Sequence, residues 1–196
     1  MPVSKNEHAL RQAVLIVALL NLAYFGIEFG VAVAIKSVSL FADSIDFLED
    51  TFINILIFIA LGWSMQRRAL VGMLLAGVLL IPSLATLWSA WEKLHLPVAP
   101  DPMLLSLAGF GALAVNLICA FILVRFRTHS GSMAKAAFLS ARNDAFANIA
   151  IIGAALITTA TMSHWPDLIV GIGILIINLD AAREVYAAAR EEFKAG

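Results

Sequence analysis

Apolar residues dominate this chain in long runs, and polar residues gather in the short breaks between the runs. A membrane-spanning helix needs about 20 mostly apolar residues to cross roughly 30 Å of hydrocarbon. The pattern predicts six such spans, at approximately 13–35, 38–63, 69–91, 103–124, 136–162 and 167–181. The last continues as "DAAREVYAAAREEFKAG", which is typical of a helix that leaves the bilayer. We therefore predict an all-α membrane protein in which residues 1–196 form a single compact bundle of six transmembrane helices.

Composition supports a membrane protein and excludes several other classes. Hydrophobic residues make up 61% of the 196 residues and charged residues only 14%, whereas soluble domains are closer to one quarter charged. The net charge of −1, without a basic patch, argues against a nucleic-acid partner. The single cysteine, Cys119, can form neither an intramolecular disulfide nor a thiolate metal cage. The first apolar run is too long for a secretory signal peptide and is interpreted as a first span.

Lysine and arginine beside the spans predict the orientation of the chain. Only Lys36 and Lys93 fall on one side of the bilayer, and the other Lys and Arg residues near span ends fall on the opposite side. Cytoplasmic flanks are the richer in these residues. We therefore expect both termini in the cytoplasm, and we expect the protein to be integral to the inner (plasma) membrane of a bacterium.

Acidic residues are concentrated in the second predicted span. The stretch "LFADSIDFLED", residues 40–50, carries four carboxylates, whereas the third, fourth and sixth spans carry no ionisable residue through their cores. A charge inside a bilayer costs at least a few kcal/mol and usually faces a cavity or a partner. Asp46 and Asp50 are four residues apart and share a helix face, and Asp43 lies on the same stripe. Bound protons or a bound divalent cation would relieve the repulsion between these carboxylates.

The fifth predicted span supplies a matching face. Its segment "SARNDAFAN" places Ser140 and Asp144 at the same spacing as Asp46 and Asp50. If the two helices are antiparallel, Asp46 is level with Asp144 and Asp50 is level with Ser140. Two helices that each contribute two side chains would form a four-ligand metal site near the middle of the membrane.

The two charged helices also share a short sequence pattern. Residues 50–54 ("DTFIN") and 144–148 ("DAFAN") both read D-x-F-x-N. An inverted repeat of three helices each would place the ion site at the interface of its two halves. The shared pattern is consistent with such a repeat.

With these residues in view, the chain resembles the transmembrane part of the cation diffusion facilitator (cation efflux) family over nearly its whole length. Residues 21–60, which include "SVSLFAD", are similar to the first two helices of that family. Asp46 and Asp50 match its [H/D]-x-x-x-D motif on the second helix, and Ser140 and Asp144 fall at the corresponding place on the fifth. The resemblance implies a secondary active transporter, not an enzyme, that exports Zn²⁺, Mn²⁺, Fe²⁺, Co²⁺ or Cd²⁺ from the cytoplasm in exchange for protons. It implies no prosthetic group, and its partners would be the metal ion, protons and the lipid bilayer.

Two departures from the family pattern change what is expected. Ser140 stands where the family usually has His or Asp, so the predicted ligands are three carboxylates and a weak hydroxyl, with Asn143 or water to complete the shell. Sites made of oxygen ligands suit Mn²⁺, Fe²⁺ or Co²⁺ at least as well as Zn²⁺. We also expect no C-terminal cytoplasmic metal-binding domain, which leaves open whether a homodimer forms through the membrane helices.

Some alternatives remain open at this stage. A non-transporting membrane metal sensor or scaffold derived from the same fold is the second interpretation, while an intramembrane hydrolase is disfavoured because every His lies in a loop or terminus. Asp43 could be a solvated mouth residue or a proton relay. Glu49 could pair with Arg142 or lie at an interface, and Glu28 could be a hydrogen-bonding residue or a ligand. The preferred metal and the proton stoichiometry are not determined by the pattern.

Overall fold

The computed structural model describes residues 5–60, 63, 67, 70, 73, 84–126 and 131–195. Within these residues the chain is helical and contains no β-strand, which confirms the all-α prediction. The helices are α1 (Lys5–Ile35), α2 (Val38–Ala60), α4 (Pro102–Leu123), α5 (Gly131–Thr161) and α6 (Trp165–Ala195), and residues 84–95 are also helical. A short 3₁₀ turn, η1 (Val124–Phe126), follows α4.

The observed helices follow the predicted spans but are longer at the polar ends of the chain. α1 begins eight residues before the predicted span, and α6 continues to residue 195, as the polar tail predicted. Much of the predicted third span, 69–91, lies outside the described residues. By length and composition, three helices of the described part can cross a membrane, within His8–Ile35, Pro102–Phe126 and Ser140–Thr161.

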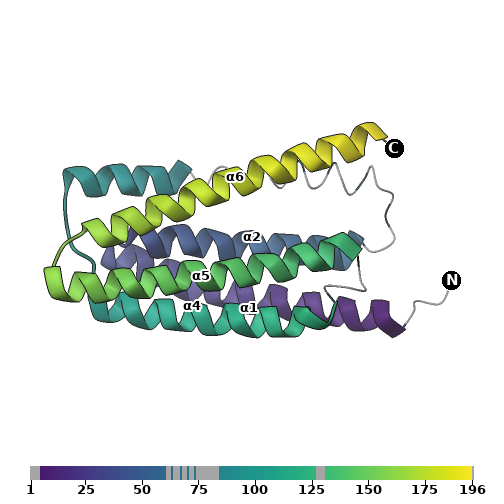
Figure 1. Ribbon diagram of the computed structural model, residues 1–196, viewed down its shortest axis with the longest axis horizontal. Coiled ribbons are helices and arrows are strands. Elements are labelled where there is room, and N and C mark those ends of the chain that lie inside the picture. Colours follow the sequence, from purple (N-terminus) through teal and green to yellow (C-terminus); the bar gives the residue numbers. More distant parts are fainter. Residues whose placement is uncertain are drawn as a thin grey trace.

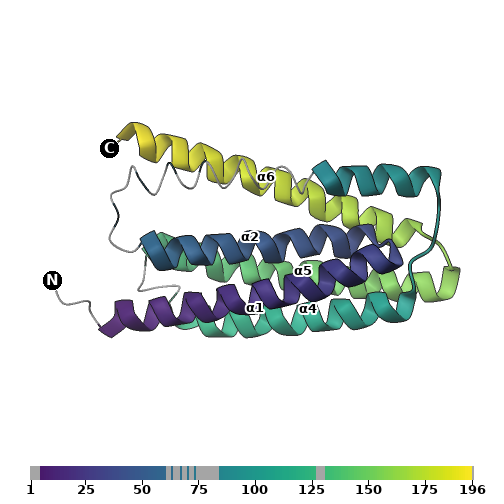
Figure 2. The ribbon, with the colours of Figure 1, turned by 180° about the vertical axis from the view of Figure 1, so that it is seen from behind.

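The helices run roughly along a common direction. In Figures 1 and 2, α1, α2, α4 and α5 lie side by side, and α6 lies along one flank of this group together with residues 84–95. The start of α1 and the end of α6 lie at the same end of the molecule (Figure 1). Toward that end α6 diverges from α5, whereas its first turns lie close to the end of α5 (Figures 1 and 2). The cytoplasmic location of this end remains a prediction.

Apolar packing joins the helices along their length. One buried cluster near the start of α1 includes Val14, Ile57 and Leu123, and a second cluster nearer the opposite end includes Leu40 and Ile151. These residues come from α1, α2, α4 and α5, so each cluster joins helices that are distant in sequence. The packing holds α2 in the interior, where Asp43, Asp46 and Asp50 are buried and Glu49 is partly exposed.

Asp167 lies in the first turn of α6, at the end of the bundle opposite the start of α1. It links α6 to the start of α2 and to the helical segment 84–95. Its completely buried carboxylate accepts hydrogen bonds from the hydroxyls of Ser37 and Ser39, both at 2.6 Å. It also accepts from the backbone N–H groups of Val38 at 2.9 Å and Ser39 at 3.2 Å. The Lys93 ammonium group completes this Asp167 cluster with an ion pair of 2.6 Å. The sequence predicted Asp167 only as the start of a helix and Lys93 only as a flanking charge.

Candidate metal centre

The predicted pairing of α2 with α5 is present at Asp50 and Ser140. The Ser140 hydroxyl donates a 2.9 Å hydrogen bond to the Asp50 Oδ1 atom, so these two side chains lie level on antiparallel helices as the spacing predicts. Asp50 is 3% exposed. Because a carboxylate buried this deeply needs donors, the neutral hydroxyl offsets part of its desolvation cost.

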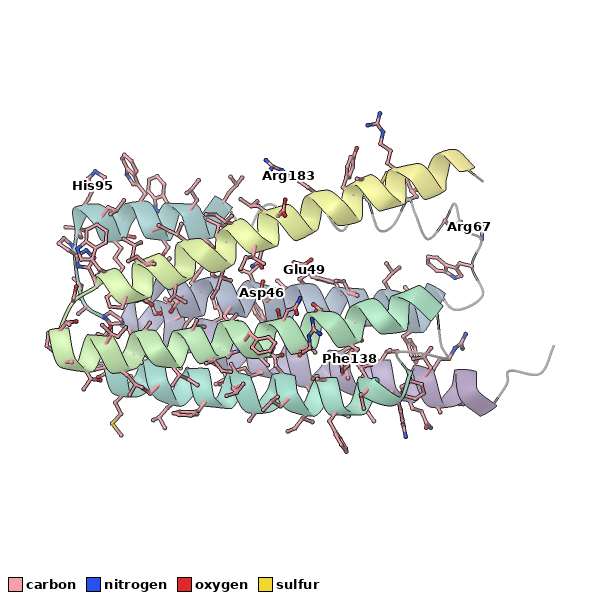
Figure 3. All side chains as sticks on the ribbon, in the orientation of Figure 1. Asp46, Glu49, Arg67, His95, Phe138 and Arg183 are labelled. Atoms are coloured by element: carbon pink, nitrogen blue, oxygen red, sulfur yellow. The ribbon has the colours of Figure 1, made fainter. Side chains whose placement is uncertain are left out.

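Asp46 and Asp144 face a common cavity. This cavity has a volume of about 470 Å³ and lies between α2, α5 and α6, where Asp46, Asn143, Asp144 and Asn178 supply its polar lining. Asp46 accepts a hydrogen bond from the side-chain amide of Asn178 on α6. Figure 3 shows Asp46 and Glu49 about halfway along the bundle, far from both ends of the helices. The cavity gives a small cation room beside two of the predicted ligands.

The four predicted ligands are not all gathered around one point. Asp50 is bonded to Ser140 of α5, whereas Asp46 is bonded to Asn178 of α6, so the two motif carboxylates of α2 have partners on different helices. Within the described ranges, no group of three or more His, Cys, Asp or Glu side chains is close enough to hold a metal ion. The four-ligand site therefore stays a prediction, and its formation would require Asp46, Asp50 and Asp144 to converge.

The short pattern shared by α2 and α5 extends to hydrogen bonding. The Asn54 side-chain amide donates to the Asp50 carbonyl oxygen at 2.8 Å, and that of Asn148 donates to the Asp144 carbonyl oxygen at 2.8 Å. Both asparagines are completely buried, and no described residue hydrogen-bonds to the Oδ1 atom of either. The two halves of the site thus have the same local structure, as an inverted repeat would produce.

Two further acids form a separate buried pair. Glu28 of α1 and Asp43 of α2 are both completely buried and close enough to interact with each other. In the part of the chain that the structure describes, none of their four carboxyl oxygens has a hydrogen bond to any other residue. Of the two alternatives for Asp43, the burial excludes the solvated mouth residue, since Glu28 of α1 lies against this side of α2.

The structure answers two questions about α5 that the sequence left open. Among the described residues no ion pair joins Arg142 to Glu49. The Arg142 guanidinium instead donates to the Asn143 Oδ1 atom at 3.0 Å and 3.4 Å. The Asn143 oxygen is thus already bonded, and the asparagine that contacts a predicted ligand is Asn178. The sequence predicts an interhelical hydrogen bond for Asn178, which its contact with Asp46 of α2 confirms. A lone amide in an apolar span gave no signal for a place in the cavity.

Comparison with known proteins decides the family. A model of the cation efflux transmembrane domain matches residues 14–192, which is most of the chain. The protein belongs to the cation efflux family. This cation efflux protein is accordingly an integral membrane protein and a transporter of metal cations, since members of the family transport rather than catalyse. Comparison with curated proteins gave no match.

Proposed function

We propose that this cation efflux protein exports a divalent transition metal from the cytoplasm in exchange for protons. Asp46, Asp50 and Asp144 would be the main ligands, with Ser140 as a weak or water-mediated fourth. The observation that carries the proposal is the Ser140–Asp50 hydrogen bond, which brings the two ligand-bearing stripes of α2 and α5 face to face inside the bundle.

The donor chemistry limits the class of ion. Carboxylate and hydroxyl oxygens are hard ligands, and in the described part of α2, α5 and α6 no His or Cys lies near the cavity. Such donors suit Mn²⁺, Fe²⁺ or Co²⁺ at least as well as Zn²⁺. We therefore propose a broad transport profile in which Zn²⁺ is not strongly preferred.

The exchange of metal for protons follows from the negative charge of the carboxylates in the site. Metal from the cytoplasm displaces protons from the carboxyl groups, the helices move to open the opposite side, and protons from that side displace the metal. Each step replaces one neutralising species by another, so the buried carboxylates are never left as uncompensated charges in a low-dielectric interior.

The test uses the full chain in proteoliposomes that contain a pH-sensitive dye and a metal-sensitive dye. The variants Asp50→Ala and Asp144→Ala should each reduce metal-driven proton movement to the level of empty vesicles, because each removes a charged ligand. Asp180→Ala, at an exposed position on α6, is the matched control and should transport as the wild type does. Wild-type rates in both ligand variants would refute the assigned site.

The same assay addresses the sensor or scaffold interpretation. Besides the two dyes, the vesicles contain only purified protein, lipid and Mn²⁺ or Zn²⁺, and a pH gradient is imposed across their membrane. Metal flux under these conditions requires no partner and would exclude a purely sensing role. Saturable metal binding without flux would instead favour the sensor.

A further inference from the structure

We infer that Asn178 of α6 is an additional ligand of the transported ion and that its amide oxygen favours Mn²⁺ over Zn²⁺. The inference rests on the proposed function and adds a third helix to the site. Asn178 lies on the wall of the cavity that Asp46 and Asp144 also line. Neither the α2 motif nor the α5 motif contains it.

Because the amide nitrogen of Asn178 is bonded to Asp46, the amide oxygen is the atom that can bind a cation. Asn178 donates through Nδ2 to Asp46, and the described residues provide no other hydrogen bond to its side chain. A side-chain amide carries a carbonyl oxygen beside its NH₂ group, and that oxygen can accept while the nitrogen donates. Asn178 can therefore hold the Asp46 carboxylate in place and offer its Oδ1 atom to the same ion.

Asn143, the other amide of the cavity, is less suited to this role. Its Oδ1 atom accepts two hydrogen bonds from Arg142, and the side chain is exposed. Binding a cation there would bring metal and guanidinium charges together at one oxygen atom. In the part of the chain that the structure describes, no cationic side chain is bonded to Asn178 or lines the cavity, so its oxygen is the better donor.

A neutral fifth oxygen changes the preference between ions. Zn²⁺ is usually satisfied by four ligands in tetrahedral geometry, which three carboxylates and Ser140 or water already supply. Mn²⁺ prefers octahedral arrangements of oxygen ligands and gains more from each added oxygen. Removing the Asn178 amide should therefore weaken Mn²⁺ transport more than Zn²⁺ transport.

The experiment compares kcat/KM for Mn²⁺ and Zn²⁺ in proteoliposomes. In Asn178→Leu the ratio of Mn²⁺ to Zn²⁺ should fall by about tenfold, the lower end of the effects seen when a supporting group is removed from a metal site. Asn178→Asp keeps an oxygen at the same place and should keep the ratio within about threefold of the wild type. Asn116→Leu, the same change at a buried position on α4, should leave the ratio unchanged.

Each outcome bears on one of the two proposals. If the wild type moves neither ion, the proposed function fails. If the wild type transports both ions and Asn178→Leu keeps the wild-type ratio, only the inference fails. A ratio that falls equally in Asn178→Asp and Asn178→Leu would show that the N–H group matters and the oxygen does not, which also overturns the ligand role. Asn178→Ala replaces the Leu variant if size-exclusion chromatography shows that the latter does not fold.

Discussion

At the scale of single residues, neutral donors are what allow carboxylates to lie inside this bundle. Ser140 donates to Asp50 and Asn178 donates to Asp46, so each motif carboxylate of α2 has one uncharged partner. A hydroxyl or amide offsets part of the cost of burial without neutralising the carboxylate. The negative charge of the carboxylates therefore remains available to a cation or to protons.

Position 140 has Ser where the family usually has His or Asp. The variant Ser140→His tests whether this position belongs to the metal shell. Ser140→His should raise the affinity for Zn²⁺ by about tenfold or more, because neutral imidazole is a preferred zinc ligand and Ser140 already lies beside Asp50. Isothermal titration calorimetry of the protein in detergent measures the change. Ser140→Ala, which removes the hydroxyl and adds no ligand, should show no such gain.

An equal affinity for Zn²⁺ in Ser140→His and Ser140→Ala would contradict the assignment of this position to the metal shell. The result would leave the Ser140–Asp50 contact as a packing interaction between α2 and α5.

The sequence predicted the contact between α2 and α5 in the site better than the contact between α2 and α6. Asp50 and Ser140 could be paired because both lie on stripes with a four-residue repeat, and antiparallel helices fix their level. Asn178 could not be placed, because the rotation of α6 about its own axis depends on its packing against α2 and not on any pattern of charge within α6.

At the scale of helices, α6 packs tightly against the start of α2 at Gly171. A Cβ atom built on Gly171 would lie 2.7 Å from the carbonyl carbon of Val38 and 2.8 Å from the backbone nitrogen of Ser39. These are backbone atoms at the start of α2, so they cannot move aside as a flexible side chain would. The contact sets how near α6 comes to α2, and with it the reach of Asn178 toward Asp46.

Replacing Gly171 should therefore separate the two helices. We expect Gly171→Ala to destabilise the protein by about 1–3 kcal/mol, the usual cost of forcing an extra carbon into a packed interior. Gly173→Ala is the matched control on the same helix, because no atom of the described residues lies within 4 Å of its added carbon. Thermal unfolding in detergent, followed by circular dichroism, compares the two variants, and equal melting temperatures would contradict the close contact.

Helix existence followed from the apolar runs, and the polar tail predicted the continuation of α6, but the early start of α1 was not predicted. The predicted spans count only residues that fit hydrocarbon, whereas α1 and α6 continue as helices through polar sequence. Charged residues such as Glu, Lys and Arg are good helix formers, so the hydrogen-bonded backbone continues after the apolar run has ended.

At the scale of the whole molecule, α6 is bonded to α2 at its first turn and diverges from α5 toward its other end. The Asp167 cluster joins the first turn of α6 to the start of α2 and to Lys93, while α6 diverges from α5 toward the opposite end (Figure 1). Lys93 also donates to the carbonyl oxygen of Lys36 at 2.7 Å, which adds the turn between α1 and α2 to the same junction. Sequence reasoning missed this junction because its members are far apart in the chain and each has an ordinary local interpretation.

Breaking the ion pair should be costly because Asp167 has no access to water. We expect Lys93→Met to reduce the free energy of unfolding by about 3–5 kcal/mol, the usual cost of leaving one buried partner of an ion pair uncompensated. Adding Asp167→Asn should recover part of that loss, because no net charge then remains buried. Chemical unfolding in detergent gives both values.

Lys36→Met is the control for the loss of a positive charge at this end of the bundle, since Lys36 is exposed and should change stability by no more than about 0.5 kcal/mol. Similar losses in Lys36→Met and Lys93→Met would contradict a specific role for the ion pair.

The Asp167 cluster also bears on how the protein is made. Ser37 caps α2 locally by accepting from the Leu40 N–H group, but the N–H groups of Val38 and Ser39 are satisfied by a carboxylate 129 and 128 positions later in the chain. Because α6 is synthesised after α2, these two donors gain their acceptor only when Asp167 reaches the start of α2. A residue far along the chain thus completes the N-terminus of α2.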